Sequence, residues 1–324
     1  MILSHHSRIQ EKLRHELGPD ILQALEDPEV IEILLNEDEK LWVDTFEGKR
    51  FYKKYDSHRA LNLINTIASI SDVVVNHDHP DLGTELRLYH DGVPKLYRFQ
   101  GLISPLVSSP IFAIRKPASR IIPMTEYVRQ DIMTEGQKFM IERAIQNKKS
   151  ILVAGGTGSG KTTLCNALLS ELSRQFPRER IVILEDTVEL QCAVEDKVQL
   201  RSSETRSLND LLRYTMRLRP DRIIVGEVRG AEAHSLIKSW NTGHPGGVCT
   251  IHANSAVSAL LRLEQLVLEA GVPVNPKAIA QAIDYVVFIR REKGENVKFV
   301  LESILQVIGY DFDQKEYKFS PSVK

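Results

Sequence analysis

The chain has few of the features that mark secreted, disulfide-bonded or membrane-spanning proteins. Among its 324 residues are only three cysteines, Cys165, Cys192 and Cys249, and none of them forms a C-x-x-C pair. This spacing indicates neither a disulfide framework nor a zinc site, and it favours a reducing compartment. No apolar run approaches the length of a bilayer span, and residues 1–8 lack the apolar stretch of a signal peptide. We therefore expect a cytoplasmic protein that acts on a membrane, if at all, from the aqueous side.

An excess of charge of one sign is also missing. Lys and Arg number 42 against 43 Asp and Glu, which gives a formal net charge of −1. A global polycation that would coat nucleic acid is therefore excluded, although a local basic patch stays open. Hydrophobic residues at 42% and charged residues at 26% are ordinary for a globular protein, and the length suffices for two domains.

The sequence does contain a phosphate-binding pattern. Residues 155–162 read GGTGSGKT and fit G-x-x-x-x-G-K-[ST], after the apolar run 151–154 and before a helical run at 164–169. Glycines let backbone N–H groups approach phosphate oxygens, Lys161 can reach the β- and γ-phosphates, and Thr162 can offer its hydroxyl to Mg²⁺. The strand before and the helix after disfavour a mere Gly/Ser-rich surface turn. We expect ATP to be bound by Gly155, Gly156, Thr157, Gly158, Ser159, Gly160, Lys161, Thr162 and Thr163.

The first part of the chain, residues 1–116, reads as a mixed α/β domain. Helical spacing of apolar residues occurs at 9–17, 30–34 and 61–68. Hairpins are predicted at 40–52 and 86–99, and a strand at 111–114. Pro117 and Pro123 interrupt the pattern, so we place a linker at 117–133.

The second part, residues 134–324, alternates strands and helices. Thr134 and Gln137 have capping-box spacing and predict a helix to about residue 146. Such alternation implies a sheet with substantial parallel pairing and helices on both faces. A strand-only tail is expected at 297–319. Strands are predicted at 151–154, 181–184, 198–200, 223–226, 248–251 and 285–290, and helices near 163–175, 207–218, 231–241, 255–269 and from Pro276.

Two of the predicted strands end in carboxylates. Glu185 and Asp186 follow 181–184, and Glu227 follows 222–226. Ligands of open α/β sheets lie at the carboxyl ends of the strands, where these acids would meet the phosphate loop. ATP hydrolysis needs a carboxylate near the γ-phosphate to orient water, whereas the alternative for each acid alone is a solvated strand end.

A third constellation is glycine-rich and contains two histidines. In residues 241–254, glycines flank His244, and a predicted strand then delivers His252 to the same edge of the sheet. His252 could hydrogen-bond phosphate or a catalytic acid and so report whether the γ-phosphate is present. A structural role is the alternative for a single histidine.

Taken together, four segments resemble a known family. The phosphate loop and residues 184–187, 218–229 and 243–254 resemble, in order and separation, the traffic ATPases of type II and type IV secretion systems. Within this family, the sequence resembles the TrbB-like conjugal transfer ATPases, and the resemblance covers most of residues 134–290. Gly226 and Glu227 stand at the Walker B position, which is typical of this family.

The resemblance implies a fold, an assembly and residue roles. The fold would be α/β, with a RecA-like P-loop NTPase C-terminal domain and a smaller mixed α/β N-terminal domain. ATP would lie between the two domains of a subunit in a homohexameric ring, with a neighbouring subunit completing the site. The implied catalytic residues are Glu185 as water-orienting base, Glu189 assisting, Glu227 with Thr162 in the Mg²⁺ shell, His252 as sensor and Arg115 reaching the γ-phosphate.

For Arg115 the alternative is a linker arginine paired with an acid. A guanidinium on a mobile domain would couple phosphoryl transfer to domain movement, in keeping with the implied role. Weaker candidates for the same site or for the subunit interface are Arg98, Arg120, Arg217, Arg219 and Arg229.

The function expected from these features is a cytoplasmic Mg²⁺-dependent ATPase that energises substrate transfer or pilus assembly by a type IV secretion or conjugation apparatus. Its partners would be further copies of itself, inner-membrane components of the apparatus and a coupling ATPase, with peripheral attachment to the inner membrane. Two alternatives remain: a helicase-like nucleic-acid motor, for which the sequence gives no strong signal, and a nucleotide-dependent scaffold with negligible turnover.

Overall fold

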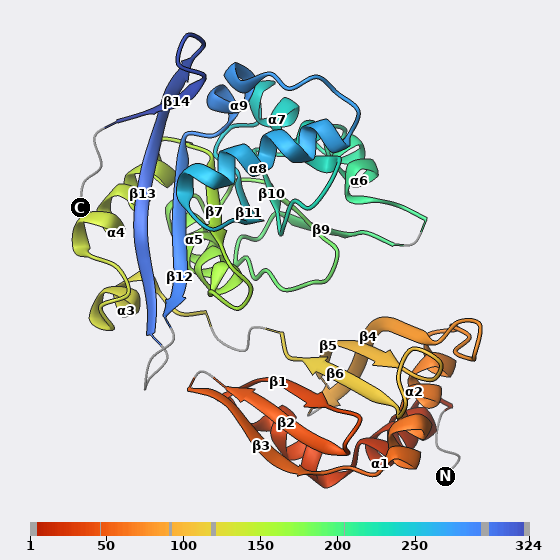
Figure 1. Ribbon diagram of the computed structural model, residues 1–324. Helices are drawn as coiled ribbons and strands as arrows, with labels where there is room; N and C mark the ends of the chain where they lie inside the picture. Colours follow the sequence, from red (N-terminus) through yellow and green to blue (C-terminus); the bar gives the residue numbers. More distant parts are fainter. Residues whose placement is uncertain are drawn as a thin grey trace. The chain divides into compact units, whose positions relative to one another are not determined.

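The chain divides into two compact units, residues 1–119 and 120–324 (Figure 1). In the part of the chain that the structure describes, no helix combines the length and apolar composition that a bilayer crossing requires. The structure is a computed structural model and describes residues 5–45, 47–90, 93–117, 121–203, 205–292 and 298–320.

The first unit is a six-stranded antiparallel sheet with two helices packed on it. Its strand order is β3-β2-β1-β6-β5-β4, and its core joins side chains of the sheet to those of α1 and α2. The helices predicted at 9–17 and 61–68, both hairpins and the strand at 111–114 are confirmed, although residues 91–92 of the second turn lie outside the described ranges. The elements are α1 (His5–Glu26), β1 (Val30–Leu35), β2 (Lys40–Thr45), β3 (Gly48–Lys54), α2 (Ser57–Ile70), β4 (Asp81–His90), β5 (Val93–Leu102) and β6 (Ile111–Arg115).

The prediction of a helix at 30–34 is wrong, because these residues form strand β1. Val30, Ile33 and Leu35 are buried, and β1 lies in the middle of the sheet between β2 and β6. The segment is rich in β-branched residues, which favour the extended chain. Its pairing on both edges supplies backbone hydrogen bonds that an isolated helical turn could not match.

The second unit is an eight-stranded sheet with helices on both faces, as the sequence predicts (Figure 1). The strand order is β14-β13-β12-β7-β11-β10-β8-β9, and the pairing is parallel from β12 to β9. All six predicted strands and the strand-only tail are confirmed. The strands are β7 (Ile151–Gly155), β8 (Ile181–Glu185), β9 (Lys197–Arg201), β10 (Arg222–Val225), β11 (Val248–His252), β12 (Tyr285–Glu292), β13 (Lys298–Asp311) and β14 (Glu316–Phe319).

The helices of this unit form two layers because each strand buries both of its faces. Leu152 and Ala154 of β7 pack with α6–α9, whereas Ile151 and Val153 pack with α3–α5. Such strands read as continuous apolar runs, which is how they were recognised in the sequence. The helices are α3 (Met124–Arg129), α4 (Glu135–Gln146), α5 (Lys161–Gln175), α6 (Leu208–Thr215), α7 (Glu232–Asn241), α8 (Ala256–Glu269) and α9 (Pro276–Ala282).

Much of the segment predicted as a linker, 117–133, is folded into the second unit. Helix α3 begins directly after Pro123, and Met124, Tyr127 and Met133 are buried in the core beneath α4 and α5. Proline is common at the start of a helix because its missing N–H would be unpaired there anyway. Pro123 therefore starts a helix here and does not mark a connecting loop.

Arg222, the first residue of β10, is fully buried and ties three segments together. Its Nε donates to Oε2 of Glu179 at 2.6 Å, and its terminal nitrogens donate to the carbonyl oxygens of Ile145 and Gly246 at 3.2 Å. The guanidinium also lies over the ring of Phe176, 4.5 Å from its centroid. A buried charge is tolerated only when it is paired and hydrogen-bonded, and Arg222 meets both conditions.

We predict that Arg222→Met lowers the free energy of unfolding by about 3 kcal/mol, because it leaves the Glu179 carboxylate and two carbonyls without this donor. Urea denaturation of the variant and the wild type measures the change. Arg178→Met, at an exposed position two residues before Arg180, is the matched control and should shift stability by no more than about 0.5 kcal/mol. Equal stability of R222M and the wild type would contradict the assignment.

Candidate nucleotide-binding site

Four parallel strands end together at one edge of the second sheet. Gly155 at the end of β7 is the register partner of His252 at the end of β11. On the far side of β11, Val225 of β10 is paired with Leu184 of β8, so that Glu185 and the residues after Val225 follow at the same edge. The register therefore brings the phosphate loop, His252, Glu227 and Glu185, all predicted site residues, to one place.

The phosphate loop, residues 155–162, is closed by its own lysine. Lys161 is 8% exposed, and its Nζ donates to the carbonyl oxygens of Gly155 at 3.0 Å and Gly156 at 2.8 Å. The same Nζ lies 3.3 Å from Nδ1 of His252. A buried ammonium needs such partners, and a nucleotide phosphate would be a stronger one.

The loop carries donors that suit an anionic ligand with many oxygens. Within the described residues, the backbone N–H groups of Thr162 and Thr163 have no acceptor, and the buried hydroxyl of Ser159 has no partner. The two amides open helix α5, where the helix dipole adds positive charge. Gly160, with φ of 90°, allows the chain to enter the helix in this way. The geometry therefore fits a bound phosphate.

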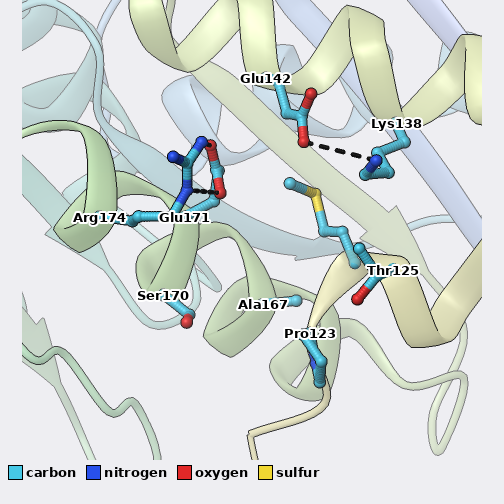
Figure 2. Close-up of a pocket in the computed structure, with 9 residues that line it drawn as sticks. Pro123, Thr125, Lys138, Glu142, Ala167, Ser170, Glu171 and Arg174 are labelled. Atoms are coloured by element: carbon cyan, nitrogen blue, oxygen red, sulfur yellow. Dashed lines mark hydrogen bonds and ion pairs between the residues drawn. The ribbon is translucent and has the colours of Figure 1, made fainter.

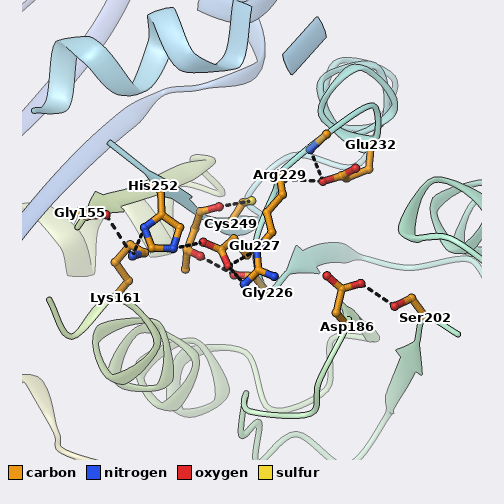
Figure 3. A network of polar contacts seen from close by, with 12 residues as sticks. Gly155, Lys161, Asp186, Ser202, Gly226, Glu227, Arg229, Glu232, Cys249 and His252 are labelled. Atoms are coloured by element: carbon orange, nitrogen blue, oxygen red, sulfur yellow. Dashed lines mark hydrogen bonds and ion pairs between the residues drawn. The ribbon is translucent and has the colours of Figure 1, made fainter. Parts of the chain in front are cut away.

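A polar chain runs from the lysine across the edge of the sheet. In Figure 3, Lys161, His252, Glu227 and Arg229 follow one another, with His252 Nε2 2.8 Å from Oε1 of Glu227. Nε of Arg229 donates to the other carboxylate oxygen at 2.6 Å. Arg229, named from the sequence only as a weaker candidate for the nucleotide or an interface, thus holds Glu227 of its own chain. In the sequence, only the spacing Glu227-Val228-Arg229 could have pointed to this contact, and that spacing alone does not predict an ion pair between Glu227 and Arg229.

Glu185, the last residue of β8, is a buried carboxylate. It is 3% exposed, and its Oε1 accepts from the backbone N–H groups of Glu189 at 2.9 Å and Leu190 at 2.8 Å. Burial raises the pKa of its carboxyl to about 7, an effect that these two donors oppose and the charge of Glu189 reinforces. A carboxyl with this pKa is suited to proton transfer near neutral pH.

Gly226 makes the burial of Glu185 possible. A Cβ at position 226 would lie 2.9 Å from Cγ of Glu185, closer than side chains pack. The carbonyl of Gly226 accepts from the Thr250 hydroxyl at 2.7 Å, which fixes the backbone that leads into Glu227. The glycine before the Walker B glutamate is therefore a packing requirement.

Glu189 and Asp186 also follow β8, and their side chains are not part of the polar chain from Lys161 to Arg229. Glu189 contributes its backbone N–H to Glu185, and its own carbonyl accepts from Asn166 at 3.3 Å. Asp186 accepts from the hydroxyl of Ser202 at 2.5 Å, as Figure 3 shows. The assisting role predicted for Glu189 stays a prediction, with its backbone as the observed contribution.

The described residues contain no cluster of three or more His, Cys, Asp or Glu that could hold a metal ion. Of the predicted metal residues, Thr162 lies in the first turn of α5, and Glu227 is engaged by His252 and Arg229. Mg²⁺ usually takes one or two protein ligands and completes its shell with phosphate oxygens and water. The residues present fit an ion that arrives with a nucleotide.

Arg115 belongs to the first unit, at the end of β6. Its register partners are Arg98 of β5 and Glu32 of β1. Burial raises the pKa of Glu32, and the charge of Arg115 opposes that shift. Glu32 is therefore an acid with which Arg115 could pair, as the alternative interpretation requires. The approach of Arg115 to the nucleotide stays a prediction. Of the weaker candidates, Arg217 and Arg219 are exposed, and Arg120 lies outside the described residues.

A separate pocket of about 480 Å³ lies between α3, α4 and the later turns of α5 (Figure 2). Its charges are matched within the wall, since Lys138 lies 3.8 Å from Glu142, and Nε of Arg174 donates to Glu171 at 2.9 Å. The first residue of α5 that lines this pocket is Ala167, beyond the first turn of the helix. The pocket is therefore distinct from the phosphate loop.

Comparisons with known proteins agree with the sequence and the fold. A probable conjugal transfer protein TrbB from Sinorhizobium fredii is 44% identical over 302 residues, covering 93% of this chain and 91% of the relative. PtlH, a type IV secretion system protein of Bordetella pertussis, is 31% identical over 306 residues, covering 83% and 88%. The solved ATPase DotB from Yersinia pseudotuberculosis has a TM-score of 0.64 at 14% identity, covering 97% of this chain and 81% of that one, and supports the fold alone.

The family model of the type II/IV secretion system proteins matches residues 21–307. This match spans the phosphate loop, the strand-end carboxylates and His252, and it extends over most of the first unit. The resemblance to the secretion ATPases and to TrbB-like proteins is confirmed, and so is the predicted α/β fold. The chain belongs to the type II/IV secretion system protein family.

Proposed function

We propose that this protein is a Mg²⁺-dependent ATPase whose turnover drives a conjugal transfer or type IV secretion apparatus. The observation that carries the proposal is the meeting of the phosphate loop, His252, Glu227 and Glu185 at the ends of adjacent parallel strands. Family membership and the TrbB relative support it.

Binding would exchange the partners of Lys161. Its ammonium now bonds to the carbonyls of Gly155 and Gly156, and the β- and γ-phosphates would take their place. The N–H groups of Thr162 and Thr163 would donate to the same anion. The lack of partners for these two amides and for the Ser159 hydroxyl within the described residues supports this mode of triphosphate binding.

Hydrolysis would depend on Glu185. Its carboxylate would orient a water molecule and accept a proton from it, while the N–H groups of Glu189 and Leu190 hold the carboxylate in place. Thr162 and Glu227 would hold Mg²⁺, which would neutralise phosphate charge when bound. His252, between Lys161 and Glu227, would respond to any change at either group.

The assembly and location form part of the proposal. Names of relatives refer to conjugal transfer and type IV secretion. We place the protein in the cytoplasm at the inner membrane, as a homohexamer with Arg115 of the first unit at the γ-phosphate. Its partners would be inner-membrane components of the apparatus and a coupling ATPase.

Two substitutions test the ATPase. Glu185→Gln should keep ATP binding and lower kcat at least about 100-fold, because the proton acceptor is lost. Lys161→Ala should lose binding as well. Phosphate release and equilibrium binding of ATP are the measurements, with the exposed Lys277→Ala as control. A wild type that binds ATP with no more phosphate release than the E185Q variant would favour the scaffold, whereas unwinding of duplex DNA would favour the motor.

The raised pKa of Glu185 predicts the pH dependence of turnover. Because the base must be deprotonated, kcat/KM should rise about tenfold per pH unit below its pKa of about 7 and level off above it. Steady-state rates between about pH 5.5 and 9, with ATP binding measured at each pH, give the profile. A flat profile with unchanged binding would exclude Glu185 as the base.

The same shift predicts a stability effect. A carboxyl whose pKa is raised on folding stabilises the folded state least at high pH, because ionisation inside the protein is disfavoured above its unfolded pKa. Replacement by Gln removes this cost, so the stability of E185Q relative to the wild type should increase by about 2 kcal/mol from pH 5 to pH 8. Urea denaturation at both pH values measures it. A pH-independent difference would contradict the shifted pKa.

A further inference from the structure

The hairpin of β12 and β13 lies against the phosphate loop on the side away from β11. β12 runs parallel to β7 as far as the pair Phe288 and Ala154, then continues past the end of β7 alongside the loop. In Figure 1, β7 lies between β11 and β12 in the sheet. The loop thus has strand-end polar groups on one side and the β12–β13 hairpin on the other.

Three side chains of this hairpin reach the glycines of the loop, and they are the buried Ile289 together with Arg291 and Phe299. A Cβ at Gly158 would lie 3.7 Å from a terminal nitrogen of Arg291, and a Cβ at Gly160 would lie 3.5 Å from the ring of Phe299. Arg291 and Phe299 are register partners across the hairpin, so they form one patch. Both are partly buried, with surface left to contact a ligand.

The positions of the carboxylates set the direction of the nucleotide. Glu185 ends β8 and Glu227 follows β10, and both strands lie beyond β11. The phosphoryl group that is cleaved must face these acids, so the opposite end of the nucleotide leaves the loop toward β12. Of the β12–β13 side chains nearest the loop glycines, Ile289 is buried, whereas Arg291 and Phe299 keep exposed surface.

We propose that Arg291 and Phe299 form the nucleoside-binding wall of the site, with the Arg291 guanidinium stacked on the nucleobase. The inference rests on the proposed function, since it places a nucleotide on the loop. A planar guanidinium packs well on aromatic ring systems, and stacking tolerates any base because each presents a π face. Phe299 positions Arg291 from the paired strand and shields the contact from water.

Arg290 supplies a matched control on the same strand. Neighbouring residues of a strand point to opposite faces, so Arg290 faces away from Arg291. Arg290 is already engaged, with Nη2 2.6 Å from Glu292 and its Nε paired with Glu302. Substituting either arginine removes the same charge from the same strand, and only Arg291 lies at the loop.

The test compares ligands with and without a nucleoside. Arg291→Ala should weaken binding of ATP and ADP about tenfold, while binding of inorganic tripolyphosphate stays at the wild-type level. Arg290→Ala should change neither. Calorimetric titration of each ligand into the purified full chain measures the constants, and intact tripolyphosphate binding shows that R291A is folded. Arg291→Lys, which keeps the charge and loses the plane, should recover little of the loss in ATP affinity.

Three outcomes would overturn the inference. Unchanged ATP affinity in R291A removes Arg291 from the site. An equal loss for ATP and tripolyphosphate, or full rescue by R291K, assigns Arg291 to the phosphates and rejects stacking. A wild type that binds neither ligand refutes the proposed function and this inference with it. This result differs from failure of the inference alone, because it is seen in the wild type before any residue is substituted.

Discussion

The structure depends on the register of four parallel strands in the second unit. Backbone hydrogen bonds fix β7, β11, β10 and β8 so that their carboxyl ends coincide at one edge. A shift by one residue in any of them would exchange the side chains that pack against the two helix layers and would displace its strand-end residue, so the apolar core and the polar edge are specified together. Residues separated by up to 97 positions, from Gly155 to His252, therefore meet because strands with hydrophobic faces must pair in register.

At this edge, the ionisable side chains of Lys161 and Glu185 are buried. The Lys161 ammonium donates to two carbonyls, and burial pushes the Glu185 carboxyl toward its neutral form despite two N–H donors. Because its pKa is raised, ionising the Glu185 carboxyl costs folding stability. Under the proposed function, a nucleotide phosphate would take over the Lys161 contacts, and a water molecule would meet the Glu185 carboxylate.

The sequence predicted the second unit well and the first less well, for identifiable reasons. Strands buried on both faces and separated by capped helices have an unambiguous pattern, whereas the short apolar run at 30–34 satisfies helical spacing and strand burial equally until its neighbours in the sheet are known. The strand-end rule located Glu185 and Glu227. Some contacts depend on the path of loops and have no signal in a single sequence. Examples are the backbone N–H groups that donate to Glu185 and the hydrogen bond from Arg229 to Glu227.

The glycines of the site show that the sequence motif identifies the phosphate loop but not the strands and side chains packed around it. A side chain at Gly155 would overlap the carbonyl oxygen of Ile289 and the hydroxyl of Ser159, and one at Gly226 would displace Glu185. The first overlap is with β12 and not with a phosphate, so that glycine is required by packing between strands before any ligand binds. Phosphate binding and sheet packing thus impose the same residue for independent reasons. A pattern match reports the first reason, and only the fold reveals the second, together with the hairpin that stands beside the loop.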